Sequence, residues 1–380
     1  MNSKRSSLRK LALTTIAICS MGAVSISQAA SSSEEPRELR LLHVAPFTGN
    51  LKSTGEFLNK AIVAYAKEVQ ATGEVPFKIT VQKADDGYVA EKTVSVAQQE
   101  IKSFKPHAMV GMVGTSNTKQ MIDKNVLSDS GVPLIGTRTG AALYSPYIVH
   151  LRASYSSEVY KILELANIQG FDTIGVVYQG DDFGQDGLQA AQAYIARTPT
   201  LKMVANAPYT RNTTEVGPAV AAMKAAQPKA ILIVGNTNAT AAFLTEIRKT
   251  DKKVRVFTMS ATDAQQVSDK AKSSALGLVV SQIVPDPYEP RFSISTDFRK
   301  FVERNKLDPN PTTFEGYLIA RITIDAAKRI KGPFTPQNLL AEIRSKPVNL
   351  GGLRFNLPDQ QRPMSFVDTL IIGSGNKIYY

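Results

Sequence analysis

Segments that favour β-strands alternate with segments that favour helices along most of this chain, and this alternation constrains the fold more than any other feature. The strand-like residues 108–113 and 230–234 are apolar almost throughout. Strands that read as apolar on both faces are typical of parallel sheets covered by helices on each side. Because helical segments of about 10–15 residues separate the strands, the chain is expected to form βαβ units.

The alternation comes in two blocks, separated near residue 153, and is followed by a shorter tail. The two blocks predict an α/β protein with two doubly wound parallel-sheet lobes. The tail contains helical patterns at 297–305, 312–330 and 336–345, and then two strand-like segments at 350–356 and 365–372. A tail of this size is too small for a core of its own, so we expect it to pack on the two lobes.

The first residues are typical of a secretory signal peptide, with a basic start, an apolar run and a small-x-small site. We expect cleavage after Ala29, which assigns residues 1–29 to the signal and predicts a soluble exported protein. Loss of Lys4, Arg5, Arg9 and Lys10 lowers the formal net charge from +12 to +8. The only cysteine, Cys19, lies inside the apolar run, so the mature chain cannot form disulfides.

Several function classes lack support in the sequence. The positive charges are scattered and not interleaved with aromatic residues, which argues against nucleic-acid binding. The three histidines, His43, His107 and His150, have no neighbour at metal-ligand spacing. No nucleophile elbow, phosphate loop or dinucleotide fingerprint is found. We therefore expect no enzyme activity, no metal and no cofactor.

Two loops rich in glycine and hydroxyl groups follow neighbouring predicted strands. One reads Gly-Thr-Ser-Asn from Gly114, and the other reads Gly-Thr-Arg-Thr-Gly from Gly136. Ligands of open parallel sheets bind beyond the carboxyl ends of the strands, and helix N-termini there attract anions. Ser116, Asn117 and Thr137 are either part of a seat for a small carboxylate or ordinary helix caps and turn residues.

A set of short motifs, in order along the chain, resembles the type I periplasmic solute-binding proteins of ABC transporters, and within them the branched-chain amino-acid binding group. The motifs are HVAPFTG, DDG, GTSNT, GTRTGA and YQGDDFGQDG. The resemblance implies a periplasmic, monomeric protein that captures a small-molecule solute and delivers it to an inner-membrane ABC permease. It also implies a hinge of three crossings, with lobe one formed by 38–153 plus 284–350 and lobe two by 154–283 plus 351–380.

The resemblance further implies where the solute is held. The loop after the third strand would grip a carboxylate, and the loop after the fourth strand would add carbonyl and hydroxyl contacts. An aromatic residue at the start of the second lobe would close over the solute. The residues at the matching positions, together with Tyr155 just past the first crossing, are Gly114, Thr115, Ser116, Thr137, Arg138, Thr139, Tyr155, Phe183, Asn236, Thr237 and Asp263.

Two departures from the family pattern affect the expected solute. Relatives that bind amino acids carry an acid where this chain has Ala261 or Thr262, and Asp263 either serves late in that role or caps the next helix. A buried ammonium without a partner is costly, so an α-amino acid and a related organic acid both stay open. Arg138 either holds a second solute carboxylate or pairs with an acid of the protein.

Two other functions share this pattern. The same clamp could report a solute to a membrane receptor, because transport and sensing need the same closed surface. An exported enzyme would need an activated nucleophile or a metal, which the residues do not supply.

Overall fold

The computed structural model describes residues 37–359 and 364–380. The predicted signal peptide, with Cys19, lies outside the described residues. Within the two described ranges, no helix has both the length and the hydropathy that crossing a bilayer requires.

A parallel five-stranded sheet organises the first part of the chain, with the order β2-β1-β3-β4-β5. Strands β3 and β4 pair directly, which places the two hydroxyl-rich loops at neighbouring strand ends, as predicted. The strands are β1 (Glu38–Ala45), β2 (Lys78–Asp85), β3 (Ala108–Val110), β4 (Leu134–Ile135) and β5 (Ile148–Val149).

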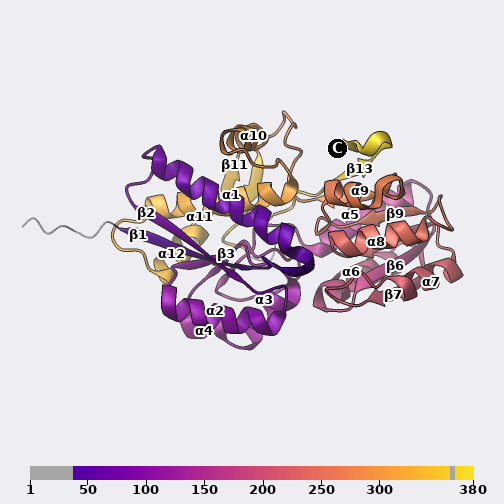
Figure 1. Cartoon of the computed structure of the whole chain (residues 1–380), viewed down its shortest axis with the longest axis horizontal. Helices are drawn as coiled ribbons and strands as arrows, with labels where there is room; N and C mark the ends of the chain where they lie inside the picture. The colour runs from indigo at the N-terminus through magenta and orange to yellow at the C-terminus, as the bar shows by residue number, and fades with distance from the viewer. Residues whose placement is uncertain (1–36, 360–363) are drawn as a thin grey trace, which may run out of the picture. The chain divides into compact units, whose positions relative to one another are not determined.

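Helices cover both faces of this sheet (Figure 1). On β1, Leu39 and Leu41 pack in one core cluster, whereas Leu42 and Val44 pack in another, because successive strand side chains point to opposite faces. The first cluster includes residues of α1 (Lys52–Ala71) and α11 (Pro311–Arg329). The second includes residues of α2 (Ala90–Phe104), α3 (Thr115–Asp123) and α4 (Val126–Ser130).

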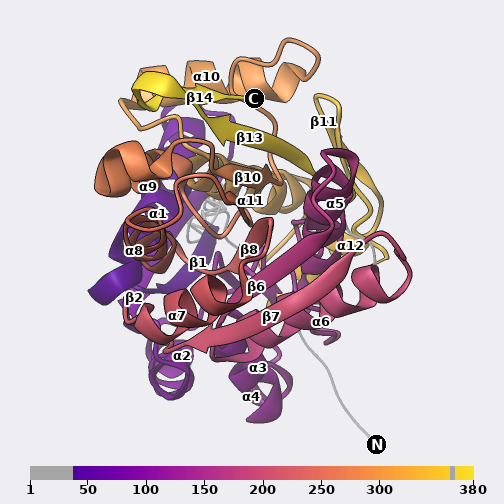
Figure 2. The ribbon, with the colours of Figure 1, turned by 90° about the vertical axis from the view of Figure 1, so that its right-hand side faces the viewer.

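A seven-stranded sheet organises the second part, with the order β14-β13-β10-β9-β8-β6-β7, and Figure 2 shows β8, β6 and β7 side by side. The five strands β6 to β10 are parallel, and β13 joins antiparallel to β10. The strands are β6 (Thr173–Gln179), β7 (Lys202–Tyr209), β8 (Ala230–Val234), β9 (Arg255–Thr258), β10 (Val279–Gln282), β13 (Asp368–Ile372) and β14 (Ile378–Tyr379).

This second sheet is also covered on both faces. One core cluster contains residues of α5 (Tyr155–Ile168) and α6 (Asp182–Ala196). The other contains residues of α7 (Gly217–Ala226), α8 (Thr237–Ile247) and α9 (Ala264–Ala271). We call the five-stranded sheet with its helices the first lobe and the seven-stranded sheet with its helices the second lobe. The predicted α/β class with two parallel-sheet lobes is confirmed.

The tail packs on both lobes, as its size predicted. Residues of α10 (Ser293–Asn305), α12 (Pro336–Arg344) and β12 (Leu353–Phe355) lie in the core of the first lobe. Strand β12 forms a hairpin with β11 (Val348–Leu350), and the turn uses Gly351 and Gly352, both at positive φ. The packing then changes to the second lobe, where Leu370 belongs to the core.

Candidate functional site between the two lobes

The two hydroxyl-rich loops run alongside each other at the edge of the first sheet. Val113 and Arg138 form a parallel bridge beyond the ends of β3 and β4. Thr115 Oγ1 lies 2.8 Å from Thr139 Oγ1, and Thr118 Oγ1 lies 2.7 Å from Thr137 Oγ1. All four hydroxyl-bearing residues are buried. Two predicted loops therefore make one cluster of hydroxyl groups.

Helix α3 begins inside this cluster, at Thr115. Its first backbone amides have no partner within the helix, and they give the cluster a positive partial charge. Gly114, just before the helix, has φ +111, a conformation that an L side chain rarely adopts. This glycine lets the chain turn sharply from strand into helix, so that hydroxyls and amides converge at one place.

An aromatic pair lies against the hydroxyl cluster. Burial raises the pKa of the Tyr155 hydroxyl, while its hydrogen bonds with Thr115 and Thr139 act in the opposite direction. The Tyr155 ring lies 5.0 Å from the ring of Phe183, between centroids. Both residues are buried, and they lie in the first turns of α5 and α6 of the second lobe. The pair thus borders the hydroxyl cluster of the first lobe.

Hydrogen bonds join the loops of the two lobes directly. Ser116 Oγ donates to Asp182 Oδ2 at 2.6 Å. Farther along the same seam, Asn238 Nδ2 donates to the carbonyl oxygen of Asn50 at 2.7 Å. The structure is therefore a closed arrangement, with the strand ends of one lobe against those of the other.

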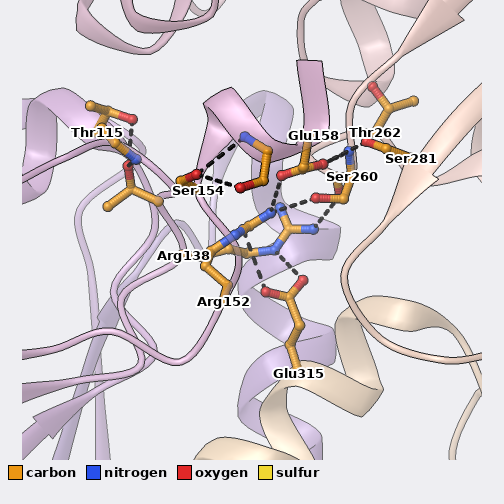
Figure 3. Close-up of polar contacts among 12 residues, drawn as sticks. Thr115, Arg138, Arg152, Ser154, Glu158, Ser260, Thr262, Ser281 and Glu315 are labelled. Carbon is orange, nitrogen blue, oxygen red and sulfur yellow. Dashed lines mark hydrogen bonds and ion pairs between the residues drawn. The ribbon is translucent and has the colours of Figure 1, made fainter. Parts of the chain in front are cut away.

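Arg138 belongs to a buried network of four charged side chains (Figure 3). Its Nε lies 3.1 Å from Glu315 Oε1, and Arg152 reaches the other oxygen of Glu315 at 3.4 Å. Arg152 also lies 3.4 Å from Glu158. Arg138 additionally donates to the Ser260 carbonyl oxygen of the second lobe at 3.1 Å. The network therefore spans the seam.

The charges of this network balance, with two guanidinium groups and two carboxylates. Glu158 Oε2 accepts hydrogen bonds from Ser260 N at 2.9 Å and Ser281 Oγ at 2.6 Å, and Glu158 Oε1 accepts from Arg152 Nη2 at 3.4 Å, so both buried oxygens have donors. Of the two roles that the sequence leaves open for Arg138, the structure shows the pairing with an acid of the protein. That acid, Glu315, is buried.

The remaining predicted residues lie at helix starts of the second lobe. Asn236 caps α8, accepting from the amides of Asn238 and Ala239. Asp263 caps α9, accepting from Gln266 N at 2.9 Å, and its own amide donates to Thr237 Oγ1 at 2.9 Å. The capping alternative for Asp263 thus describes its observed contact.

A second polar group at the seam contains Asn117, which the sequence had indicated, and three residues that sequence reasoning missed, Tyr88, Gln179 and Arg211. Tyr88 is buried and has φ 63, an uncommon conformation for a residue with a side chain. Gln179 Nε2 donates to the Tyr88 hydroxyl at 3.1 Å, across the two lobes. The DDG motif just before Tyr88 marked a turn, but no local pattern indicated which side chain of the turn enters the seam.

The histidines are accounted for by packing. Burial lowers the pKa of His43 to about 4, and its ring contacts the Gly111 carbonyl oxygen at 3.2 Å. Burial also lowers the pKa of His107 to about 4. In the part of the chain that the structure describes, no group of three His, Cys, Asp or Glu residues is arranged to hold a metal ion.

The fold agrees with comparisons to known proteins. The sequence profile of a family described as periplasmic binding protein matches residues 38–365. A substrate-binding periplasmic protein from Ralstonia solanacearum is similar at 23% identity and a TM-score of 0.85, over 90% of this chain and 99% of that one. A possible leucine/isoleucine/valine-binding protein from Rhodopirellula baltica is similar at 22% identity and a TM-score of 0.86, over 92% and 98%.

A third similar structure is a fatty acid ABC transporter substrate-binding protein from Thermomonospora curvata. It shares 20% identity and a TM-score of 0.79, over 90% of this chain and 91% of that one. No curated protein matches the chain. Because the family profile spans nearly all of the described residues, the chain belongs to the periplasmic binding protein family.

Proposed function

We propose that this chain is the exported substrate-binding protein of an ABC transporter, which closes its two lobes on a small carboxylate-bearing solute. One observation carries the proposal: the buried hydroxyls of Thr115 and Thr139 lie at the N-terminus of α3, where loops of both lobes meet. Hydroxyl groups and free helix amides together suit a carboxylate. Closure excludes water there and strengthens each polar contact.

In this proposal the residues of the seam have different roles. Gly114, Thr115 and Ser116 hold the carboxylate, and Thr137 and Thr139 complete the hydroxyl cluster. Tyr155 and Phe183 cover the apolar part of the solute. Asn236, Thr237 and Asp263 line the second lobe, and Arg138 shapes its loop through Glu315.

A carboxylate is also the group that the solutes in the relatives' names have in common. Leucine, isoleucine and valine name one similar structure, and fatty acid names another. The two solute classes differ in the ammonium group. This chain carries Ala261 and Thr262 where the family pattern leads us to expect an acid, so the proposed solutes include amino acids and deaminated organic acids.

We further propose the lobe boundaries 38–153 plus 284–350 and 154–283 plus 351–380, with hinge crossings near 153, 283 and 350. The membership of β1 to β5 and of β6 to β10 in separate sheets supports the first two crossings. Leu353 and Leu357 still pack in the first lobe and Leu370 packs in the second, which supports a third crossing later in the chain than residue 350, between 357 and 370. The protein would act as a periplasmic monomer with an inner-membrane permease as its partner.

The test is a thermal-shift screen of the mature protein after unfolding and refolding, which removes bound solute. Each α-amino acid is paired with its deaminated acid, because a solute that binds the native state raises the melting temperature. A shift with amino acids would assign the ammonium to Asp263 or another acid. A shift with the deaminated acids alone would assign the site to organic anions.

A matched pair of variants keeps the screen specific for the seam. T115V replaces a hydroxyl of the cluster by a methyl group of similar size and should remove the shift. T245V changes a hydroxyl that bonds the Ala241 carbonyl oxygen within α8, and it should keep the shift. If neither melting temperature nor X-ray scattering of the wild type responds to any saturating solute, the proposed function is wrong.

A further inference from the structure

Arg211 reaches from the second lobe to the α3 end of the first lobe. It lies in the loop between β7 and α7. Its Nη2 donates to Asn117 Oδ1 at 2.5 Å and to the Tyr88 carbonyl oxygen at 3.0 Å. Asn117 stands in the first turn of α3, beside Ser116. A cationic group of the second lobe therefore lies at the proposed carboxylate seat.

Arg211 lies outside the balanced network of the other two arginines and has one carboxylate partner of its own. Arg138 and Arg152 are matched by Glu315 and Glu158 in the balanced network. Arg211 Nε lies 3.3 Å from Asp181 Oδ2.

The Asp181 carboxylate accepts hydrogen bonds from several other donors. It also accepts from Phe183 N and Gly184 N, and from Gln179 Nε2 at 2.7 Å. The carboxylate is thus shared among four donors, while Arg211 Nη2 contacts only neutral oxygens in the bonds described above. The Nη2 group of Arg211 would therefore still attract an incoming anion.

Neighbouring groups fix the plane of the Arg211 guanidinium. Its Cζ lies 4.2 Å from the centroid of the Tyr88 ring. That ring is itself held, because the Tyr88 hydroxyl accepts from Gln179 and a Cβ at Gly114 would lie 2.7 Å from Tyr88 Cε2. A guanidinium held in one plane presents its nitrogens as a fork that matches the two oxygens of a carboxylate.

The seat beside Arg211 already holds a carboxylate. Ser116 Oγ donates to Asp182 Oδ2 at 2.6 Å, and Asp182 comes from the second lobe. In the closed structure the first turn of α3 thus receives one carboxylate and one guanidinium from the opposite lobe. The chemistry that a solute carboxylate would need is assembled at this turn.

We propose that Arg211 is a specificity-determining residue, which pairs with the carboxylate of the solute across the seam. This inference rests on the proposed function, since it names the charge partner of the same solute. It also assigns a cation to the second lobe, whereas the predicted contacts of the carboxylate all come from the first.

The experiment compares acids with their uncharged amides, using 3-methylbutanoate against 3-methylbutanamide and L-leucine against L-leucinamide. Affinities are measured by calorimetry for the wild type, R211Q, R211K and N238A. R211Q should weaken acid binding roughly 30-fold or more, because it removes one partner of a desolvated charge pair, and should change amide binding little. R211K should fall between, since its point charge lacks the fork.

N238A is the matched control, because Asn238 also bonds across the seam but through a neutral amide that takes part in no ion pair. It should weaken acids and amides by the same factor. If R211Q behaves like N238A, Arg211 only holds the lobes together and the inference is wrong. If R211Q binds acids as the wild type does, the inference fails while the proposed function stands. If the wild type binds no acid of either pair, both fail.

Discussion

Replacing Glu158 by glutamine should destabilise the protein strongly, although the side chain keeps its size. Glu158 is fully buried and accepts from Ser260 N, Ser281 Oγ and Arg152. The variant leaves two guanidinium groups with the single carboxylate of Glu315. Removing one partner of a buried ion pair costs about 3–5 kcal/mol of unfolding free energy, because the other charge stays buried without compensation.

Urea denaturation can resolve this loss. For a slope of roughly 3 kcal/mol per molar urea, the midpoint should fall by about 1–1.7 M. Far-UV circular dichroism and tyrosine fluorescence suit the assay, because the chain has 13 tyrosines and no tryptophan. The matched control is D172N, which breaks an exposed pair with Lys229 and should leave the midpoint unchanged.

A double variant separates lost charge balance from lost packing. R152M combined with E158L removes one charge of each sign and leaves the Arg138–Glu315 pair intact. Well-packed apolar side chains often replace a buried pair at little cost, so the double variant should be more stable than E158Q alone. A midpoint of E158Q equal to that of D172N, or a double variant less stable than E158Q, would refute the reasoning.

Three further predictions follow from single contacts. D182N removes the protein's own carboxylate from Ser116 and should tighten binding of a carboxylate solute roughly fivefold in calorimetry, since one like charge near the seat is worth about 1 kcal/mol; weaker binding would contradict this. G114A should abolish the thermal shift with solute, because its Cβ would lie 2.5 Å from Asn117 Oδ1; retained binding would show that the loop tolerates it. His43 has a pKa of about 4 in the native state, below its ordinary 6.5, so unfolding takes up a proton as pH falls from 6.5 to 4. Protonation of His43 in the unfolded state should lower the free energy of unfolding by about 3 kcal/mol between pH 6.5 and 4. H43Q should therefore show a shallower pH dependence of the urea midpoint.

The sequence alone determined the layered architecture. Sequence patterns identified β1 to β4 and β6 to β10. Inner strands such as β3 and β8 were recognisable because doubly covered strands must be apolar on both faces, a requirement visible in a few consecutive residues. Adjacent strand ends followed from the order of elements, and they brought Thr115 beside Thr139 as expected. The family followed from short motifs in a fixed order.

Only the tertiary structure showed which strands pair when they are far apart in the sequence. The segments 350–356 and 365–372 were predicted to be antiparallel strands. In the structure β12 pairs with β11 and β13 pairs with β10, because the path of the tail brings these strands side by side. The helix predicted after β3 is two helices, α3 and α4, with Asn125 at φ 55 before the second.

The polar contacts at the seam were decided in the same way. Arg138 and Glu315 are 177 positions apart, and Arg211 and Asn117 are 94 apart. A charged side chain has no local signature that distinguishes solvent from a distant partner, since either environment satisfies it. Strand periodicity is a property of neighbours along the chain, whereas the partner of a buried charge is a property of the closed tertiary structure.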